Sequence, residues 1–192
     1  MIIGLISETT INDNTGTSVY VDEISKNLTK YCRVYLFIPT KNNSYISKDK
    51  FDRYIFHIKN SPENHYQNFL TKRDLFLKNL EIELDKINNI EKFDLFHCLY
   101  GHYFHFLKKY NKPIFWTCHN VPPNENKPLL YNMNLFTLII NKVFFAVIRS
   151  KHKSLIKKFE FTKIFTPSVY VKNTLINEIH VPAKKIIHIN NL

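Results

Sequence analysis

The chain has 192 residues, of which 44% are hydrophobic and 15% aromatic, so it can bury the core of one domain and is short for two. Lysine and arginine together outnumber aspartate and glutamate by 27 to 16, and the formal net charge is +11. The positive residues are nearly all lysines, and no basic motif interleaved with aromatics occurs, so we expect a solvated lysine surface and no nucleic-acid partner.

The cysteines and the N-terminus indicate the compartment. Cys32, Cys98 and Cys118 leave an odd count, and two of them lie in apolar strand-like runs, which favours buried, reduced thiols. The chain begins without a basic leader, and its first apolar run is too short for a signal peptide. We therefore expect a cytoplasmic protein.

The first half of the sequence alternates short apolar runs with helical patterns. Ile2 to Ser7 is apolar without alternation, as is typical of a strand covered on both faces. Residues 33–38 and 51–58 predict two further strands. The expected helices are one with apolar positions at Val21, Ile24, Leu28 and Tyr31, and one from the capping residue Ser61 to about residue 91.

The second half continues this alternation. Strands are predicted at residues 94–99 and 113–118, from Lys163 onward, and at residues 185–189. The helices expected between them are residues 103–110, residues 129–159, and residues 169–179 with Ser168 as a cap that accepts a first-turn hydrogen bond. This order predicts an α/β fold, a Rossmann-like parallel sheet with helices on both faces.

Gly16 stands between the first strand and the first helix and is one of only three glycines, at places where we expect a side chain not to fit. A glycine here lets a phosphate or a sugar approach the backbone amides of a helix N-terminus. A plain strand-to-helix turn explains it equally well. The G-x-G-x-x-G fingerprint and the P-loop are both absent, which counts against a simple nucleotide-binding domain.

Two residues follow the strand predicted at 113–118. His119 and Asn120 would emerge at the edge where open α/β sheets bind ligands. A histidine in this position is often only a hydrogen-bonded structural residue, so the pattern alone leaves both roles open.

A second polar group ends the strand predicted at 94–99: His97, Tyr100, Gly101 and His102. Together with Cys98, Cys118 and His119 it invites a metal site. No pair has the short spacing of a zinc site, however, so we expect no metal.

The segment from residue 135 to 148 is apolar almost all round and is followed by basic residues. It is too short and too interrupted to span a bilayer of about 30 Å. A helix covered by neighbouring elements is the simpler interpretation; contact of one end with a membrane surface is the alternative.

The closing stretch has a specific order of elements. A strand from Lys163 ends in the cap Ser168, and after the helix a Val181-Pro182 break leads to a strand that Asn190 closes. This order resembles the segment that ends the first domain of retaining glycosyltransferases of the GT-B type, classified as family 4. The resemblance implies that residues 1–192 form a single Rossmann-like domain, the N-terminal, acceptor-side half of a GT-B fold.

Two shorter matches support the same resemblance. Gly16-Thr17 matches the family's loop beside the donor sugar and its diphosphate, and Thr117-Cys118-His119 matches a Thr-x-His that contacts the transferred sugar or the acceptor. The resemblance thus implies a catalytic role for His119. The implied substrate-binding residues are Gly16, Thr17, Tyr100, His102 and Asn120.

The implied reaction is transfer of a sugar from a nucleotide-sugar, a co-substrate, to an acceptor hydroxyl, with no metal and no cofactor. The acceptor is a glycan or a lipid-linked molecule of cell-surface glycan or glycolipid synthesis, handled in the cytoplasm or peripherally at the inner face of the membrane. The C-terminal donor-binding domain of the family is absent from this sequence, so we expect the chain alone to be inactive. The alternatives are a non-catalytic binding or interaction module and a subunit of a split glycosyltransferase.

Overall fold

A computed structural model describes residues 1–11, 15–59, 72–88, 92–99, 105–119 and 161–189, with residues 146, 150, 154 and 156. The chain divides into two compact units, Met1–Thr117 and Cys118–Leu192, and each is described by itself. The described elements of the first unit are β1 (Ile2–Ile6), α1 (Gly16–Leu28), β2 (Arg33–Thr40), β3 (Tyr45–Lys48), β4 (Tyr54–Lys59), α2 (Lys72–Asn88), β5 (Leu95–Cys98), the 3₁₀ helix η2 (His105–Tyr110) and β6 (Ile114–Thr117).

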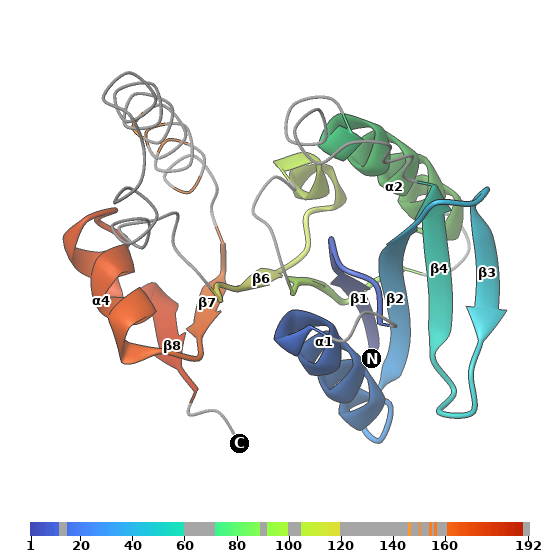
Figure 1. Ribbon diagram of the computed structural model, residues 1–192, viewed down its shortest axis with the longest axis horizontal. Coiled ribbons are helices and arrows are strands. Elements are labelled where there is room, and N and C mark those ends of the chain that lie inside the picture. Colours follow the sequence, from blue (N-terminus) through green and yellow to red (C-terminus); the bar gives the residue numbers. More distant parts are fainter. Residues whose placement is uncertain are drawn as a thin grey trace, which may run out of the picture. The chain divides into compact units, whose positions relative to one another are not determined.

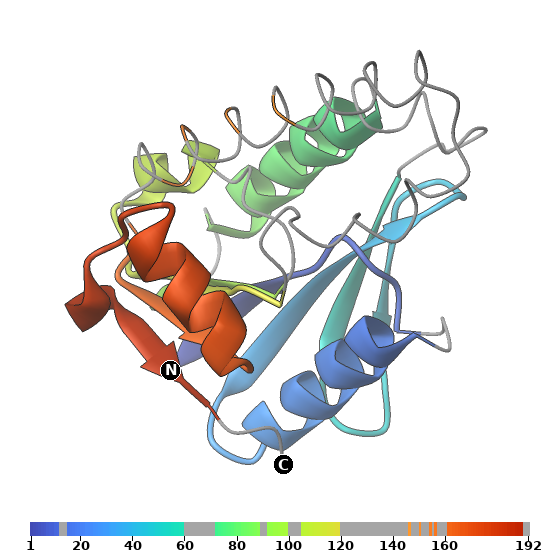
Figure 2. The same cartoon turned by 60° about the vertical axis from the view of Figure 1, so that its left-hand side comes forward.

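The strands of the first unit form one sheet in the order β3-β4-β2-β1-β5-β6. All neighbouring pairs are parallel except β3 with β4, which form an antiparallel hairpin at the outer edge. Helices α1 and α2 cover opposite faces of this sheet (Figures 1 and 2). The α/β class and the Rossmann-like parallel sheet with helices on both faces are thereby confirmed.

Side chains from alternate strand positions pack under α1. Leu5 of β1 and Val34, Leu36 and Ile38 of β2 form a buried cluster with Val21 of the helix. Successive strand residues point to opposite faces, so this alternation gives each face of β2 its own apolar layer. Strand β2 is apolar on both faces, as a strand buried between two helices requires.

The face under α2 is aromatic. Phe37 of β2 stacks on Phe56 of β4, Tyr35 meets the same ring at a tilt, and both β2 rings meet Phe93 edge-on. A side chain at Gly4 would not fit, because its Cβ would lie 2.7 Å from the ring of Phe96. The expectation that a glycine marks a crowded position is therefore confirmed at Gly4.

One buried cation fastens the β3–β4 hairpin to α1. Arg53 is only 3% exposed and donates hydrogen bonds to Asp49 in the hairpin turn and to Asp22 and Ser25 of the helix, over 2.5 to 2.8 Å. Asp22 also pairs with Lys26 one turn further along the helix. A buried arginine needs such partners, because an unpaired buried charge is very costly.

The second unit contains β7 (Lys163–Thr166), α4 (Val169–Asn177), the 3₁₀ turn η4 (Ala183–Lys185) and β8 (Ile186–His188), with β7 and β8 parallel. Its core includes Phe161, Ile164, Val171 and Leu175. After α4 the backbone takes a positive φ of 63° at His180, and Val181 then donates to the carbonyl of Leu175 over 2.9 Å.

The predictions at Tyr31 and Ser168 were wrong, and others are confirmed in part or lie outside the described residues. Tyr31 lies beyond the end of α1 and is 80% exposed. The short helix predicted over residues 103–110 is confirmed from His105 onward, where it is a 3₁₀ helix, and residues 103–104 lie outside the described residues. Ser168 precedes α4 in extended conformation but makes no capping hydrogen bond with its side chain. Residues 61–71 and most of 129–159, both predicted as helical, lie outside the described residues.

Candidate functional site

Three parallel strands of the first unit, β1, β5 and β6, end side by side, and α1 begins at the same edge. Ser7 follows β1 and donates its amide to the carbonyl of Phe37, and Leu99 follows β5 and donates to the carbonyl of Ile6. Carboxyl ends of parallel strands are where ligands bind in open α/β sheets. We call this edge, between Ser7 and Thr117, the strand-end site.

Helix α1 presents its N-terminus at the strand-end site. Thr15 caps it, because its hydroxyl accepts a hydrogen bond from the amide of Ser18 over 3.2 Å. The first turn carries no acidic side chain. The remaining amides and the positive end of the helix dipole suit an anion.

Gly16 is the first residue of α1, and Thr17 follows it. A Cβ built on Gly16 meets no atom within 4 Å, so in the described part of the chain no crowding explains this glycine. The expectation of a tight fit at Gly16 was therefore wrong. No described residue fills the space beside Gly16, and such space is what a ligand approaching the amides would need.

Ser18 adds a buried polar atom to the same turn. Its side chain is fully buried, and its Oγ has no hydrogen-bond partner among the residues that the structure describes. A buried hydroxyl without a partner costs about 1–3 kcal/mol, so such groups usually serve a purpose.

A hydrogen-bonded network joins α1 to the ends of β5 and β6. The Oγ1 of Thr117 lies 2.8 Å from Nε2 of His97 and 3.4 Å from the hydroxyl of Tyr20. Burial raises the pKa of Tyr20, and the hydrogen bond with Thr117 only partly opposes this, so the phenol is neutral. The sequence marks His97 and Thr117 as strand-end residues, but nothing in its pattern indicates that Tyr20 joins them.

The two buried cysteines near these strand ends are poor nucleophiles. Burial raises the pKa of Cys98, and the charge of Glu8 raises it further. Burial likewise raises the pKa of Cys118. Because the thiolate is the reactive form, both groups are structural thiols at neutral pH, and no disulfide joins the cysteines.

The remaining predicted site residues are not all brought together. Gly16 and Thr17 lie in the first unit, whereas His119 follows β6 and belongs to the second, half-buried. Just before it, Cys118 donates its amide to the carbonyl of Phe165 in β7 over 2.8 Å. Tyr100, His102 and Asn120 lie outside the described residues. Their roles, and that of His119, stay predictions.

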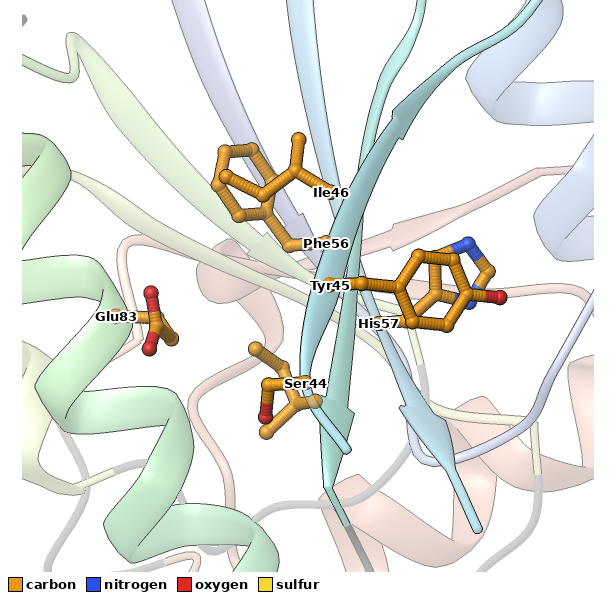
Figure 3. A pocket seen from close by; sticks show the side chains of 7 residues that line it. Ser44, Tyr45, Ile46, Phe56, His57 and Glu83 are labelled. Carbon is orange, nitrogen blue, oxygen red and sulfur yellow. The ribbon is translucent and has the colours of Figure 1, made fainter. Parts of the chain in front are cut away.

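A separate hollow of about 320 Å³ lies at the outer edge of the first unit's sheet. It is lined by Ser44, Tyr45, Ile46, Phe56, His57, Ile58 and Glu83. Figure 3 shows Ile46, Phe56 and Glu83 on the α2 side of the hairpin, and the stacked rings of Tyr45 and His57 on the other side. None of the site residues predicted from the sequence lines this hollow.

In the described ranges, no three residues of His, Cys, Asp and Glu gather closely enough to hold a metal ion. None of the helices within those ranges is long and apolar enough to cross a membrane.

Solved structures resemble this chain in fold. A sucrose-phosphate synthase chain from Thermosynechococcus elongatus matches with a TM-score of 0.68 at 12% identity, over 100% of this chain and 90% of that one. Anabaena HepE, solved with UDP and glucose, matches with a TM-score of 0.53 at 11% identity, over 100% of this chain and 44% of that one. A glycosyltransferase from Rickettsia africae matches with a TM-score of 0.54 at 13% identity, over 99% of this chain and 42% of that one.

The present chain thus spans less than half the length of the latter two proteins. No curated protein matches the sequence. The model of the family described as Glycosyltransferase Family 4, in contrast, matches residues 14–192, which is most of the chain. The chain therefore belongs to glycosyltransferase family 4.

Proposed function

We propose that this chain is the acceptor-side half of a retaining glycosyltransferase of the GT-B type. In that role it takes part in moving a sugar from a nucleotide-sugar to the hydroxyl of an acceptor. The observation that carries the proposal is the family match over residues 14–192. The open first turn of α1 at the strand-end site supports it, because a diphosphate leaving group needs donors of this kind.

In the proposed mechanism, the first turn of α1 contributes backbone amides to the sugar and diphosphate of the donor. Gly16 keeps that approach open, since no described atom crowds it, and Thr17 stands beside it. His119, with Asn120, is proposed to contact the transferred sugar or the acceptor hydroxyl. Tyr100 and His102 would add acceptor contacts beyond β5.

The nucleotide itself is proposed to bind to a second half, on a continuation of the chain or on a partner subunit. This fits the fact that the chain covers 42–44% of the Rickettsia and Anabaena proteins. Transfer requires donor and acceptor to be held at the same time in fixed geometry. One half alone cannot do so, and we propose that the 192-residue chain by itself has no transferase activity.

We place the reaction in the cytoplasm or at the inner face of the membrane, with a glycan or lipid-linked acceptor of cell-surface glycan or glycolipid synthesis. The high excess of lysine supports contact with anionic lipid headgroups. No metal and no cofactor are included in the proposal. HepE, a fold relative, was solved with UDP and glucose, which suggests UDP-sugars as the first donors to try.

The test compares the 192-residue chain with the protein joined to its donor half, using UDP-, GDP- and ADP-sugars and a panel of glycan and lipid-linked acceptors. The joined protein is expected to transfer sugar, and His119→Ala to lower its rate at least tenfold. Tyr31→Ala, at an exposed residue outside the site, is the matched control. Transfer by the 192-residue chain alone would refute the division into halves, and a joined protein without transfer would refute the function.

A further inference from the structure

A pair of stacked aromatic rings lies on the β3–β4 hairpin of the first unit. The ring centroids of Tyr45 and His57 are 4.0 Å apart and the ring planes are only 9° from parallel. His57 is half-buried, whereas Tyr45 is 48% exposed. Of the described rings, only His57 stacks on Tyr45, so one face of the tyrosine ring is covered and no described ring covers the other.

The strand register places this pair at the ligand edge of the sheet. Tyr45 lies opposite His57, and His57 lies beside Ile38 in the parallel ladder of β4 and β2. Ile6 pairs with Phe37, so the row that contains Ile38 is level with Ser7, where β1 has ended. Tyr45 is thus at the same carboxyl edge as the strand-end site.

The pair also lies on the same face of the sheet as α1. Ile55, two positions before His57, packs in the cluster beneath α1, and residues two apart in a strand share a face. Figure 3 agrees, because Tyr45 and His57 project away from Glu83 of α2. An acceptor lying along this edge on the α1 side would meet both the first turn of α1 and the ring of Tyr45.

The histidine that supports the tyrosine ring is itself held by a neighbouring side chain. Ser47 lies on the same face of β3 as Tyr45, and its Oγ is 3.1 Å from Nε2 of His57. Burial lowers the pKa of His57, so its imidazole is neutral at pH 7 and stacks as an uncharged ring. A ring that is already held loses little conformational entropy on binding.

From these observations we propose that Tyr45, supported by His57 and Ser47, is a stacking platform for a pyranose ring of the acceptor. The apolar C–H face of a pyranose carries partial positive charge and fits the negative face of an aromatic ring. Its hydroxyl groups need hydrogen-bonding partners around the ring. Lys41, Asn42 and Asn43, all exposed and shortly before Tyr45, are the side chains that we propose to supply them.

A rival role for this surface is strand pairing with a second copy, because β3 is an edge strand. The surroundings disfavour it. Lys48 is the last residue of the short strand and Lys41 precedes the strand, and lysines on an edge strand oppose pairing between chains. A monosaccharide-sized ligand is a better match for one exposed ring among polar groups.

The experiment uses the 192-residue chain and saturation-transfer NMR with methyl glycosides of glucose, galactose, mannose and N-acetylglucosamine, and with short oligosaccharides of these sugars. Saturation is expected to be strongest at the ring C–H protons of at least one sugar. Tyr45→Ala should weaken that binding by about three- to tenfold, the value of one aromatic stacking contact. Tyr45→Trp should retain it, and Tyr31→Ala is the control at a distant exposed tyrosine.

Two results would overturn the platform: no saturation of any sugar, or equal binding by wild type and Tyr45→Ala. A loss of self-association on Tyr45→Ala, measured by analytical ultracentrifugation, without sugar binding would assign the surface to a second copy instead. The platform rests on the proposed function, but the two fail differently. If the joined protein transfers sugar and Tyr45→Ala does not change the rate, only the stacking platform is refuted. If sugar binding depends on Tyr45 but the joined protein shows no transfer, only the proposed enzymatic function is refuted.

Discussion

The hydroxyl of Thr117, the last residue of β6, lies 2.8 Å from Nε2 of His97 in β5. Both side chains are buried, and the hydroxyl of Tyr20 in α1 lies 3.4 Å from the same oxygen. One threonine thus joins two neighbouring strands and a helix at the strand-end site. Thr117 lies two positions before His119 in the sequence.

Thr117→Val keeps the shape of the side chain and removes the shared hydroxyl. The substitution leaves His97 without this partner, and we expect a loss of about 1–3 kcal/mol in the free energy of unfolding. Thr117→Ser retains the hydroxyl and should recover most of that loss. Urea unfolding measures both variants, and equal stability of Thr117→Val and wild type would show that the network contributes nothing.

Arg53→Met tests the fastening of the hairpin to α1. Removing one partner of a buried ion pair leaves uncompensated charge and typically costs about 3–5 kcal/mol, here shared by Asp22 and Asp49. Lys48→Met removes a cation from an exposed ion pair with Asp52 on the same hairpin and is expected to change the stability far less, because such pairs are screened by solvent. Thermal unfolding followed by circular dichroism compares the two, and similar melting temperatures would contradict a structural role for Arg53.

The ion pairs of Arg53 with Asp22 and Asp49 should make the free energy of unfolding depend on pH. Burial alone would raise the pKa of Asp22 and of Asp49, but the hydrogen bonds from Lys26 and Arg53 to Asp22 and from Arg53 to Asp49 outweigh it, and both pKa values lie below the usual one. A lowered pKa in the folded state stabilises the protein above the unfolded pKa of about 4 and loses that contribution as the pH falls further. Asp22→Asn should flatten the decline between about pH 4 and pH 2. An unchanged slope would show that other carboxyl groups cause it.

The two glycines with known surroundings predict opposite outcomes. Gly4→Ala pushes a methyl group into the buried ring of Phe96, and overpacking of this kind costs about 1–3 kcal/mol. Gly16→Ala meets no described atom within 4 Å and should leave the melting temperature nearly unchanged. If Gly16 keeps room for a ligand, Gly16→Ala should still lower sugar transfer by the joined protein. A fall in stability at Gly16 comparable with that at Gly4 would contradict this contrast.

His180→Gly should stabilise the second unit. His180 has a φ of 63° after α4, and a side chain in this conformation costs about 1 kcal/mol that glycine does not incur. For a chain of this length, 1 kcal/mol corresponds to a rise of roughly 2–4 °C in melting temperature. His180→Ala keeps the Cβ and serves as the control. If His180→Ala raised the melting temperature as much as His180→Gly, the backbone conformation would not be the cause.

Sequence patterns predicted the sheet better than the details of its edges. The strand from Ile2 and the strand from Arg33 are long apolar runs buried on both faces, and such runs leave little choice of structure. Tyr45–Lys48 escaped prediction because it is short, mostly exposed, and stabilised by pairing with β4 rather than by its own composition.

The candidate site was predictable only where residue type and position coincide. His97 and Thr117 stand at strand ends and could be singled out from the sequence. Tyr20 and the pair of Tyr45 with His57 become neighbours only through the register and the packing of α1, which no local pattern encodes. At Ser168 a favourable cap residue forms no capping bond, since propensity states a preference and not an outcome.

The position of Arg53 has a mechanical consequence. Its partners Asp22 and Ser25 lie in the later turns of α1, and Asp49 lies in the turn that joins β3 to β4, at the end of the hairpin away from Tyr45. Arg53 therefore anchors the hairpin to the later turns of α1, whereas Gly16 and Tyr45 lie at the opposite ends of these two elements. The buried ion pairs thus hold the helix and the hairpin together without occupying the edge that we propose for the acceptor.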